Sequence, residues 1–384
     1  MRVVHLSTIH QALDVRIFEK ECRTLAAHGY EVYFVVNSPP CDRKSGVTFW
    51  PIEISPTASK LQQVWQRYAS ACSRALQLNA EVYHFHDTEL IVLGLFLKLK
   101  GFRVIYDVHE DSPREAISLN KNRPVFGFVK FCVWHVLEFL AKQFLDAFVC
   151  VTPPIAAKFP PRKTYLVRNF PRLDKVALPK GSVMMPYGKR ENVAVYAGGI
   201  TEIRGIAEMI DAIAHTPPPL NAHLLLLGAF SPPSLESEMQ QRPGWSQVDF
   251  LGWRSRESVV EQLGRSRVGL VTLLPEPIYL ESLPVKLFEY MNAGLPVIAS
   301  DFPLWRTLIE EIDCGLLVDP ANPLEIADAM EYLFTHPDIA EAMGKRGQAV
   351  VQNTYNWNSE AQTLLTLYQT LAPLPEFSPE GGVV

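Results

Sequence analysis

Short apolar runs typical of β-strands alternate with amphipathic runs typical of α-helices along almost the whole chain. The pattern begins with an expected strand over residues 2–7, an expected helix over residues 15–28 and an expected strand over residues 31–36. Parallel strands need a crossover connection, which is usually a helix, so this alternation predicts parallel sheets with helices on both faces. We therefore expect an α/β protein made of doubly wound domains.

One segment interrupts the alternation. Residues 173–190 lack periodicity and contain several prolines and glycines, which favours a linker. The chain has 384 residues, enough for two domains at roughly 100 to 200 residues each. The predicted parts are an N-terminal domain over 1–172, the linker over 173–190, a C-terminal domain over 191–355, and a last helix with a tail over 356–384. For the last helix, packing against the N-terminal domain is one of the alternatives.

The charge balance argues against nucleic acid as a partner. Lys and Arg number 36 against 41 Asp and Glu, so the formal net charge is −5 and the basic excess needed for binding a phosphate backbone is absent. The six cysteines are scattered without a C-x-x-C pair or zinc-type histidine spacing, which predicts a reducing, cytoplasmic environment. Because an apolar strand begins at residue 2, we expect no signal peptide.

Residues 125–151 are apolar enough to be tested as a membrane span. Lys or Asp at the bilayer centre costs on the order of 2.5 to 3.5 kcal/mol each. We therefore predict that the segment does not span, and we interpret it as a core helix. A second interpretation, in which its apolar rows rest on a membrane surface, stays open. The ionisable side chains of the segment are Lys130, His135, Glu138, Lys142 and Asp146.

Ligands of open α/β sheets bind beyond the carboxyl ends of strands, where helix N-termini gather. In the C-terminal domain an expected strand over residues 193–197 runs into Gly198 and Gly199, which lack a Cβ and let a phosphate approach the backbone. Arg204 follows at the start of the next expected helix and supplies a fixed positive charge. We interpret the turn as a phosphate site, with a tight turn that binds nothing as the alternative.

A second turn in the same domain indicates an anion site. Pro284 suits the first turn of a helix, and Gly294 suits its end. Backbone N–H groups near Ser282, Leu283 and Lys286 are then expected to point at a ligand, and the Lys286 ammonium adds charge. The combination predicts that the helix start binds phosphate.

Two carboxylates flank this helix start. Glu281 lies just before it, and Glu289 lies about one and a half turns into it. Carboxylates in these places can accept hydrogen bonds from sugar and ribose hydroxyls. An exposed helical carboxylate without a ligand is the alternative for Glu289.

The seven residues between Glu281 and Glu289, followed by Tyr-Met-Asn-Ala-Gly-Leu-Pro-Val, resemble the E-x7-E signature of retaining glycosyltransferases of family 4, which have the GT-B fold. The similarity extends over most of the chain, and the N-terminal turn resembles a subgroup that makes bacterial surface polysaccharides. Further motifs that match are His86-Asp87-Thr-Glu-Leu, Asp107-Val-His109-Glu-Asp, Arg204-Gly205, Gly315-Leu-Leu-Val-Asp-Pro320 and Tyr355-Asn-Trp357.

The resemblance implies two Rossmann-like domains that face an interdomain cleft, a nucleoside diphosphate sugar as donor, and retention of the anomeric configuration. UDP-glucose is the expected donor, and we expect no metal or other cofactor, since no D-x-D ends a strand. In one departure from the family pattern, Gly199 stands where many members have Arg, so Lys286 is expected to replace that contact. The implied roles are Arg204 and Lys286 at the diphosphate, Glu281 at sugar hydroxyls, His109 at the far edge of the sugar, Glu289 at the ribose and Trp253 at the base.

The first domain is expected to bind the acceptor, because the donor landmarks fall in the second. Its leading turn holds His10, Asp14, Arg16 and Lys20. Arg16 and Lys20 are four residues apart and hence on one helical face, where two cations suit a phosphorylated or lipid-linked acceptor. A solvated helix face, with Asp14 serving only as N-cap, is the alternative.

These features predict a cytoplasmic, metal-independent glycosyltransferase. If residues 125–151 rest on a membrane surface, the enzyme works at the inner face of the membrane. It would transfer a sugar from UDP-glucose to a glycan or lipid-linked acceptor in surface polysaccharide synthesis. Two other functions remain. A GT-B sugar-nucleotide epimerase would need an acid and base pair around C2 and no acceptor. A non-catalytic subunit that activates a partner would not need Glu281, Lys286 and Glu289, which this chain retains.

Overall fold

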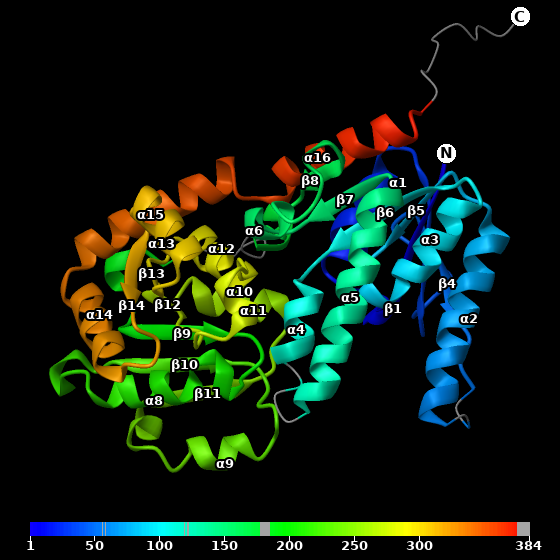
Figure 1. The fold of residues 1–384 in the computed structure, drawn as a ribbon. Coiled ribbons are helices and arrows are strands. Elements are labelled where there is room, and N and C mark those ends of the chain that lie inside the picture. The colour runs from blue at the N-terminus through cyan, green and yellow to red at the C-terminus, as the bar shows by residue number, and fades with distance from the viewer. Residues whose placement is uncertain (56, 58, 119, 121–122, 177–184, 375–384) are drawn as a thin grey trace, which may run out of the picture. The chain divides into compact units, whose positions relative to one another are not determined.

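The computed structural model describes residues 1–384 apart from 56, 58, 119, 121–122, 177–184 and 375–384. Two compact units divide the chain: unit 1 contains Met1–Arg168 and Asn358–Val384, and unit 2 contains Asn169–Trp357. Each unit has its own sheet with helices packed against it (Figure 1). The α/β class predicted from the alternation of strands and helices is confirmed.

The sheet of unit 1 has eight strands in the order β3-β4-β2-β1-β5-β6-β7-β8. All neighbouring pairs are parallel except β3 with β4. The strand order reverses between β1 and β5, which is the topological switch point of the sheet. Ligands of open α/β sheets bind at such a point, beyond the carboxyl ends of the strands. The strands are β1 Arg2–Gln11, β2 Glu31–Asn37, β3 Arg43–Lys44, β4 Val47–Ile52, β5 Val82–Phe85, β6 Arg103–Val108, β7 Ala147–Cys150 and β8 Thr164–Leu166.

Helices cover both faces of this sheet, and their bounds are η1 Ile17–Cys22, α1 Arg23–Ala27, α2 Lys60–Leu78, η2 Thr88–Leu90, α3 Ile91–Leu99, α4 Ser112–Ser118, α5 Pro124–Phe144, α6 Pro153–Ala156, η3 Pro161–Lys163 and α16 Trp357–Leu371. Crossovers between parallel strands are right-handed, so η1 and α1 lie on one face. The helices α2, α3 and α5 connect strands in the opposite direction and lie on the other (Figure 1). Tyr368 of α16 packs beside Tyr30 and His84, with ring centres 5.6 and 6.1 Å away.

The first helical segment differs from the regular helix expected over residues 15–28. It begins with the π-helical turn η1, where the N–H groups of Glu19 and Glu21 donate to the carbonyls of Asp14 and Arg16, five residues earlier. Such a turn inserts one extra residue and rotates the side chains that follow. The segment becomes an α-helix only in α1.

The interpretation of residues 125–151 as a core helix is wrong. Within α5, all of which the structure describes, the buried residues are Gly127, Glu138 and Ala141. By length and composition alone α5 is able to cross a membrane. However, α4 and α5 together form the crossover between β6 and β7, which pair with each other, and α5 packs beside α3 and α4. Its apolar side chains point outward instead of into the core.

The sheet of unit 2 has six strands in the order β11-β10-β9-β12-β13-β14, and every pair is parallel. Its switch point lies between β9 and β12. The strands are β9 Val193–Ala197, β10 His223–Leu227, β11 Val248–Gly252, β12 Val268–Val271, β13 Val297–Ser300 and β14 Gly315–Val318.

Two apolar cores lie against this sheet, one under α8 and α14 and the other under α12 and α13. The α-helices of unit 2 are α7 Leu173–Val176, α8 Ile206–Ala214, α9 Leu235–Met239, α10 Arg256–Leu263, α11 Pro277–Leu280, α12 Val285–Asn292, α13 Pro303–Ile312, α14 Pro323–Thr335 and α15 Pro337–Asn353.

The division into units falls near the predicted domain boundaries. Unit 2 begins at Asn169, so the expected linker over 173–190 lies inside it, and residues 177–184 of that linker are outside the described residues. Beyond Trp357 the last helix belongs to unit 1. There, the carboxylate of Glu360 accepts a hydrogen bond from the Arg168 backbone N–H at 2.7 Å and forms an ion pair with the Arg168 side chain at 2.7 Å.

Gly269 in β12 allows α12 to pack closely on the sheet. A Cβ at this position would lie 2.4 Å from Cδ2 of Tyr290, whose hydroxyl accepts a hydrogen bond from the Ala197 N–H at 2.7 Å. We expect Gly269→Ala to displace Tyr290 and to lower the free energy of unfolding by about 1–3 kcal/mol. Gly188→Ala is the control, since a Cβ there meets nothing within 4 Å. Equal denaturant midpoints for the two variants would contradict this packing role.

Candidate functional site

In unit 2, two cations lie close to the glycine turn after β9. A Cβ at Gly198 would lie 3.1 Å from Nζ of Lys286, and a Cβ at Gly199 would lie 3.1 Å from Nη1 of Arg204. Gly198 has a φ of 137°, which side chains rarely tolerate. Arg204 also donates to the Gly199 carbonyl at 2.9 Å. The structure thus brings together four residues that the sequence assigned to a phosphate site.

Lys286 has an unusual environment for a cation. Its Nζ is buried without a hydrogen-bond partner among the described residues and lies 3.7 Å from the centre of the Tyr196 ring. Burial lowers the pKa of Lys286 well below its ordinary value, and the Arg204 charge acts in the same direction. A buried polar group without a partner costs free energy, and an anion bound beside it would supply the missing interaction.

The start of α12 lies beside this amine, because Lys286 is in its first turn. The expectation that the Ser282 N–H is free for a ligand is wrong, since it donates to the Tyr279 carbonyl at 3.2 Å in the turn after α11. The Ser282 carbonyl accepts from Nε1 of Trp305 at 2.7 Å, which fixes this turn. The first N–H groups of an α-helix have no partner within the helix, so those of Val285 and Lys286 remain the donors suited to an anion.

Glu289 forms an ion pair that the sequence did not reveal. Its Oε1 lies 2.6 Å from Nη2 of Arg256, in the first turn of α10. Trp253 precedes this helix and is 75% exposed, so its ring is available to a planar ligand. Glu281 ends α11 and is half-buried. Arg256 follows closely after the strand that ends at Gly252. This position of a basic residue is the sequence signal that could have identified Arg256 as part of the site.

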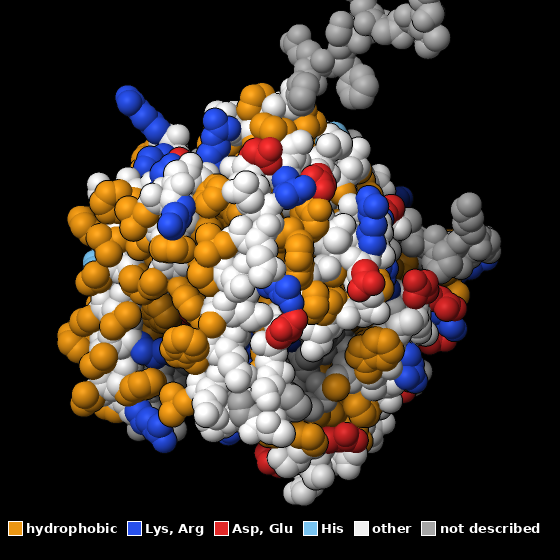
Figure 2. Space-filling model, turned by 90° about the vertical axis from the view of Figure 1, so that its right-hand side faces the viewer, with side chains coloured by type: hydrophobic (Ala, Val, Ile, Leu, Met, Phe, Trp, Pro, Cys, Tyr) orange, Lys and Arg blue, Asp and Glu red, His pale blue; other side chains and the backbone are white. Residues whose placement is uncertain are grey.

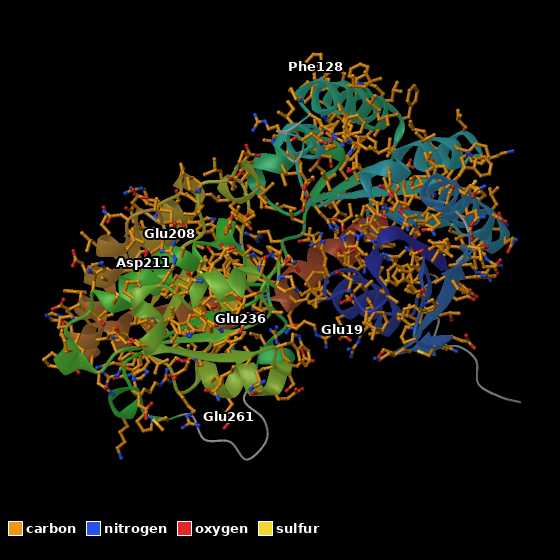
Figure 3. The ribbon with its side chains drawn as sticks, turned by 90° about the horizontal axis from the view of Figure 1, so that it is seen from below. Glu19, Phe128, Glu208, Asp211, Glu236 and Glu261 are labelled. Atoms are coloured by element: carbon orange, nitrogen blue, oxygen red, sulfur yellow. The ribbon has the colours of Figure 1, made fainter. Side chains whose placement is uncertain are left out.

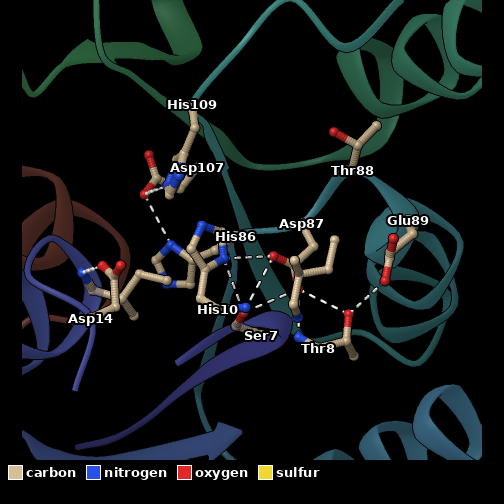
Figure 4. Close-up of polar contacts among 12 residues, drawn as sticks. Ser7, Thr8, His10, Asp14, His86, Asp87, Thr88, Glu89, Asp107 and His109 are labelled. Atoms are coloured by element: carbon tan, nitrogen blue, oxygen red, sulfur yellow. Dashed lines mark hydrogen bonds and ion pairs between the residues drawn. The ribbon is translucent and has the colours of Figure 1, made fainter. Parts of the chain in front are cut away.

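In unit 1, Asp87 organises the second half of β1 (Figure 4). Its carboxylate accepts hydrogen bonds from the Ser7 hydroxyl at 3.1 Å, the Thr8 hydroxyl at 2.9 Å and Nδ1 of His10 at 2.9 Å. The hydrogen bond to Asp87 raises the pKa of His10. Although burial acts to raise it, the pKa of Asp87 is lowered by hydrogen bonds from His10 and Thr8. His10 is therefore held as a hydrogen-bond donor to an ionised carboxylate.

Asp107, at the end of β6, is a second centre of hydrogen bonds. Its carboxylate lies 2.6 Å from Nε2 of His109, 2.9 Å from Nδ1 of His86 and 2.8 Å from Nη2 of Arg16. Although burial acts to raise it, the pKa of Asp107 is held well below its usual range by Arg16 and His109. An ionised carboxylate can only accept, so both imidazoles donate to it and their orientation is fixed.

The predicted exposed cationic face of the first helix is wrong. Arg16 and Lys20 are 4% and 1% exposed. Arg16 pairs with Asp107 and with Glu21, and its Nη1 donates to the Val167 carbonyl at 3.0 Å. The π-helical turn and the attraction of these carboxylates direct the guanidinium inward. Asp14 acts as the predicted cap, since its Oδ1 accepts from the N–H groups of residues 16 and 17 at 2.8 and 2.9 Å.

A cavity of about 340 Å³ opens in unit 1 beside His10 and His109. Its opposite wall comes from α4 and α5, through Glu115, Lys130 and Trp134. Burial, and then a hydrogen bond with Glu110, raises the pKa of Glu115 to about 8. Sequence reasoning found the two histidines and missed the α4–α5 wall, because helical spacing gave no sign that these side chains face β1.

Two groups in unit 1 are close enough to bind a metal ion. One contains His5, Glu21, His84 and His86, and the other contains His86, Asp107 and His109. Hydrogen bonds already engage several of these atoms: Nδ1 of His5 lies 2.9 Å from Nε2 of His86, and Nδ1 of His84 lies 2.9 Å from the Tyr368 hydroxyl. Burial raises the pKa of Glu21 well above its usual range, which disfavours the carboxylate that a metal needs. The expectation of no metal stays a prediction.

Comparison with known protein families gives a match over residues 186–350, which lie within unit 2. This part of the chain matches the family described as "Glycosyl transferases group 1". The other family motifs, around His86 and His109, lie outside the matched part.

Curated relatives match different shares of their own length. The α-D-kanosaminyltransferase of Streptomyces kanamyceticus is 25% identical over 47% of this chain and 46% of its own length. The D-rhamnosyltransferase WbpZ of Pseudomonas aeruginosa is 26% identical over 72% of this chain and 70% of its own. The lipopolysaccharide glucosyltransferase WaaG of Escherichia coli is 24% identical over 46% of this chain and 47% of its own. The match therefore spans about half the length of two of these three proteins.

Solved structures match nearly the whole chain. A sucrose-phosphate synthase from Thermosynechococcus elongatus superposes with a TM-score of 0.77 at 19% identity, over 96% of this chain and 98% of that one. HepE of Anabaena, in complex with UDP and glucose, superposes with a TM-score of 0.72 at 15% identity, over 96% of this chain and 100% of that one. At these identities the likeness establishes the fold alone, and each unit has the parallel, Rossmann-like sheet that the family motifs implied.

The Arg16–Asp107 contact should be essential to the stability of unit 1. Arg16→Met would leave Asp107 buried without its cation, and breaking such a pair costs about 3–5 kcal/mol. Hydrogen exchange at the amides of β1 and β6 should detect this loss. Arg23→Met is the control, since it removes a partly exposed pair with Glu19, four residues away, and such pairs contribute about 0.3–0.5 kcal/mol. Equal exchange rates in the two variants would refute the role of Arg16.

Proposed function

Because residues 186–350 form a glycosyl transferases group 1 domain on a chain with the GT-B fold, we propose that the protein transfers a sugar from a nucleoside diphosphate sugar to an acceptor. The observation that carries the proposal is the buried, unpartnered Nζ of Lys286 beside Arg204 at the Gly198–Gly199 turn. Two cations around a turn without side chains suit a diphosphate better than a single carboxylate or a neutral ligand.

The remaining unit 2 residues fit the other parts of such a donor. Glu289 can accept hydrogen bonds from a ribose, and its ion pair with Arg256 holds it in position. Glu281, before the helix start, would bind hydroxyls of the sugar, and the exposed ring of Trp253 would stack on the base. We propose UDP-glucose as donor; HepE, which shares the fold, has a structure in complex with UDP-glucose.

Catalysis in this proposal is mainly electrostatic. As the bond between the sugar and the diphosphate breaks, negative charge develops on the leaving phosphate. Arg204, Lys286 and the first N–H groups of α12 are fixed around the position of that charge, so they stabilise it without rearranging. Retention of the anomeric configuration, which the E-x7-E resemblance implies, is part of this proposal.

The acceptor is proposed to bind in the unit 1 cavity. Its wall offers the imidazoles of His10 and His109, the carboxyl pair Glu110 and Glu115, and the ring of Trp134. Carboxylates and imidazoles bind sugar hydroxyls, and an indole ring packs against a sugar face. We propose a glycan or lipid-linked acceptor in bacterial polysaccharide synthesis, in the cytoplasm. WbpZ and WaaG, which are similar to this chain, are named as a rhamnosyltransferase and a lipopolysaccharide glucosyltransferase.

The direct test is calorimetry with UDP, followed by mass detection of product from UDP-glucose and a panel of lipid-linked sugars. UDP binding together with an acceptor that gains a hexose mass would support the proposal. Conversion of the sugar nucleotide without any acceptor would favour an epimerase. No UDP binding would exclude UDP-glucose as donor, and no binding of any nucleoside diphosphate would favour the non-catalytic alternative.

The two carboxylates should have separate effects. A hydrogen bond to a charged group contributes about 1.5–3 kcal/mol, so Glu289→Gln should weaken UDP binding roughly 10- to 100-fold. Glu281→Gln should lower turnover while UDP binding stays nearly normal, because Glu281 is assigned to the sugar. Glu261→Gln, an exposed carboxylate in α10, is the control. Unchanged kinetics in both test variants would remove the carboxylates from the site.

Lys286 should take up a proton when UDP binds. Its pKa is depressed in the free protein, and a neighbouring diphosphate favours the ammonium form and raises that pKa again. UDP affinity should therefore fall as the pH rises from the depressed pKa of Lys286 in the free protein to its higher pKa in the complex, and the binding enthalpy should depend on the ionisation enthalpy of the buffer.

A matched pair of variants isolates this effect. Lys286→Met should abolish the buffer dependence and weaken UDP at least about tenfold. Lys345→Met, which removes an exposed lysine of α15, should change neither. Buffer-dependent enthalpy that persists in Lys286→Met would assign the proton to another group.

Transfer should not need a divalent metal. The cations and the helix start provide the counter-charge that Mg²⁺ or Mn²⁺ supplies in metal-dependent sites. We expect less than about a twofold change in rate when EDTA is added. Loss of activity in EDTA that manganese restores would contradict this prediction.

A further inference from the structure

Unit 1 has an apolar outer surface on the side of α2, α3 and α5. More than half of the exposed large hydrophobic side chains of the described residues lie on α2, α3, α4 and α5. On α5 they include Val125 at 78% and Phe128 at 62% exposure, and Phe128 projects outward from its helix (Figure 3). Figure 2 shows hydrophobic side chains gathered on this side, with Lys and Arg between them. Apolar surface of this extent on a folded unit indicates an interaction site.

The apolar surface of α5 is continuous along the helix. Val125, Val129, Cys132, Val136 and Phe139 are all exposed and are separated by three or four residues, so they form one outward row. At 1.5 Å per residue the helix is about 31 Å long. Because α5 packs beside α3 and α4, with Leu137 and Ala141 on its inner side at the core, the row lies on the surface of unit 1 and presents an apolar strip.

The charge on these helices is opposite to that of the whole chain. The three helices α2, α3 and α5 carry six Lys and Arg residues, and their only acidic residue is Glu138. Arg74, Lys98 and Lys142 form ion pairs with Glu53, Asp146 and Glu138, and Lys130 lines the cavity, which leaves Lys60 and Arg67 as the cations outside both. Glu138 is buried, and burial raises its pKa to about 7. The chain as a whole has a formal net charge of −5. An apolar strip with cations around it fits an anionic lipid surface, because lipid takes up the strip and its headgroups attract the cations.

We propose that this face of unit 1 docks on the surface of an anionic bilayer, with α5 lying in the interfacial plane. The outer row of α5 enters the lipid, and Trp65 of α2, 74% exposed, contacts the headgroup level. The inner side of the same helix supplies Lys130 and Trp134 to the cavity, so a polar group tethered to lipid reaches that cavity from the bilayer. The docking itself does not depend on transferase activity, so its test is separate from that of the proposed function.

Vesicle flotation of the full-length protein tests the proposal. Wild type should float with phosphatidylcholine vesicles that contain about 30% phosphatidylglycerol and bind pure phosphatidylcholine much more weakly. The triple variant Val129→Gln/Val136→Gln/Phe139→Gln should lose roughly tenfold of the binding, because glutamine keeps helix propensity and removes the apolar row. The double variant Leu324→Gln/Ile339→Gln, which changes exposed apolar residues on unit 2 helices, should bind like wild type.

Two of the six free cysteines, Cys132 and Cys41, are exposed, and with the half-buried Cys72 replaced by serine they allow a direct measurement of insertion. A polarity-sensitive fluorophore on Cys132, in a Cys41→Ser background, should shift to the blue when anionic vesicles are added. The same fluorophore on Cys41, in a Cys132→Ser background, should not shift, since Cys41 lies in the loop after β2, away from α5. Equal shifts from the two positions would overturn the placement of α5 at the interface.

Two outcomes would assign the surface to protein instead of lipid. Wild type that stays with the aqueous fraction in anionic vesicles would overturn the proposal. So would a dimer in lipid-free solution that the triple variant converts to monomer and that does not bind vesicles. Monomeric wild type that floats, together with a monomeric triple variant of unchanged circular dichroism that does not, would support lipid as the occupant.

Discussion

The buried contact between Arg16 and Asp107 is the constraint on which unit 1 depends. It joins the first helical segment to the end of β6, and the same carboxylate holds His86 and His109. An ionised carboxylate inside a protein is tolerated only when charge and hydrogen bonds replace its hydration. Arg16 supplies the charge, and the histidines supply hydrogen bonds. The ring orientations of the histidines follow from this requirement. The hydrogen bonds that stabilise the buried Asp107 carboxylate therefore also shape the cavity beside His10 and His109.

Unit 2 shows a different situation at Lys286, whose buried amine has no hydrogen-bond partner among the described residues and whose pKa is lowered by burial. The glycines at 198 and 199 make room for it and for Arg204. Local arrangements that cost free energy in the free protein are expected at functional sites, since the missing interaction comes from the ligand. This contrast separates the two sites: Asp107 in unit 1 has partners within the protein, whereas the Lys286 amine in unit 2 is the group that we propose for an anion.

The helix α5 connects fold and surface. In the crossover between β6 and β7, α5 contributes Leu137 and Ala141 to the core, whereas Gly127 lies against α4. A narrow buried contact of this kind leaves most of the helix circumference outside. In the docking that we propose, its outer apolar side chains enter the lipid, while its inner side forms the wall of the cavity.

The sequence by itself determined the α/β class, the parallel sheets and the residues around the unit 2 anion site, because strand and helix periodicity, glycine turns and helix starts are local properties of the chain. It did not determine burial at Arg16 and Lys20, the Glu289–Arg256 pair, the use of the Ser282 N–H or the outward face of α5. Each of these depends on which distant element lies opposite. Arg16 turns inward because Asp107, ninety-one residues later, places a carboxylate there, and α5 is exposed because nothing among the described residues covers its outer row. Spacing along the chain encodes which residues share a helix face, whereas only the packing of one element on another decides whether that face meets a partner, the core or solvent.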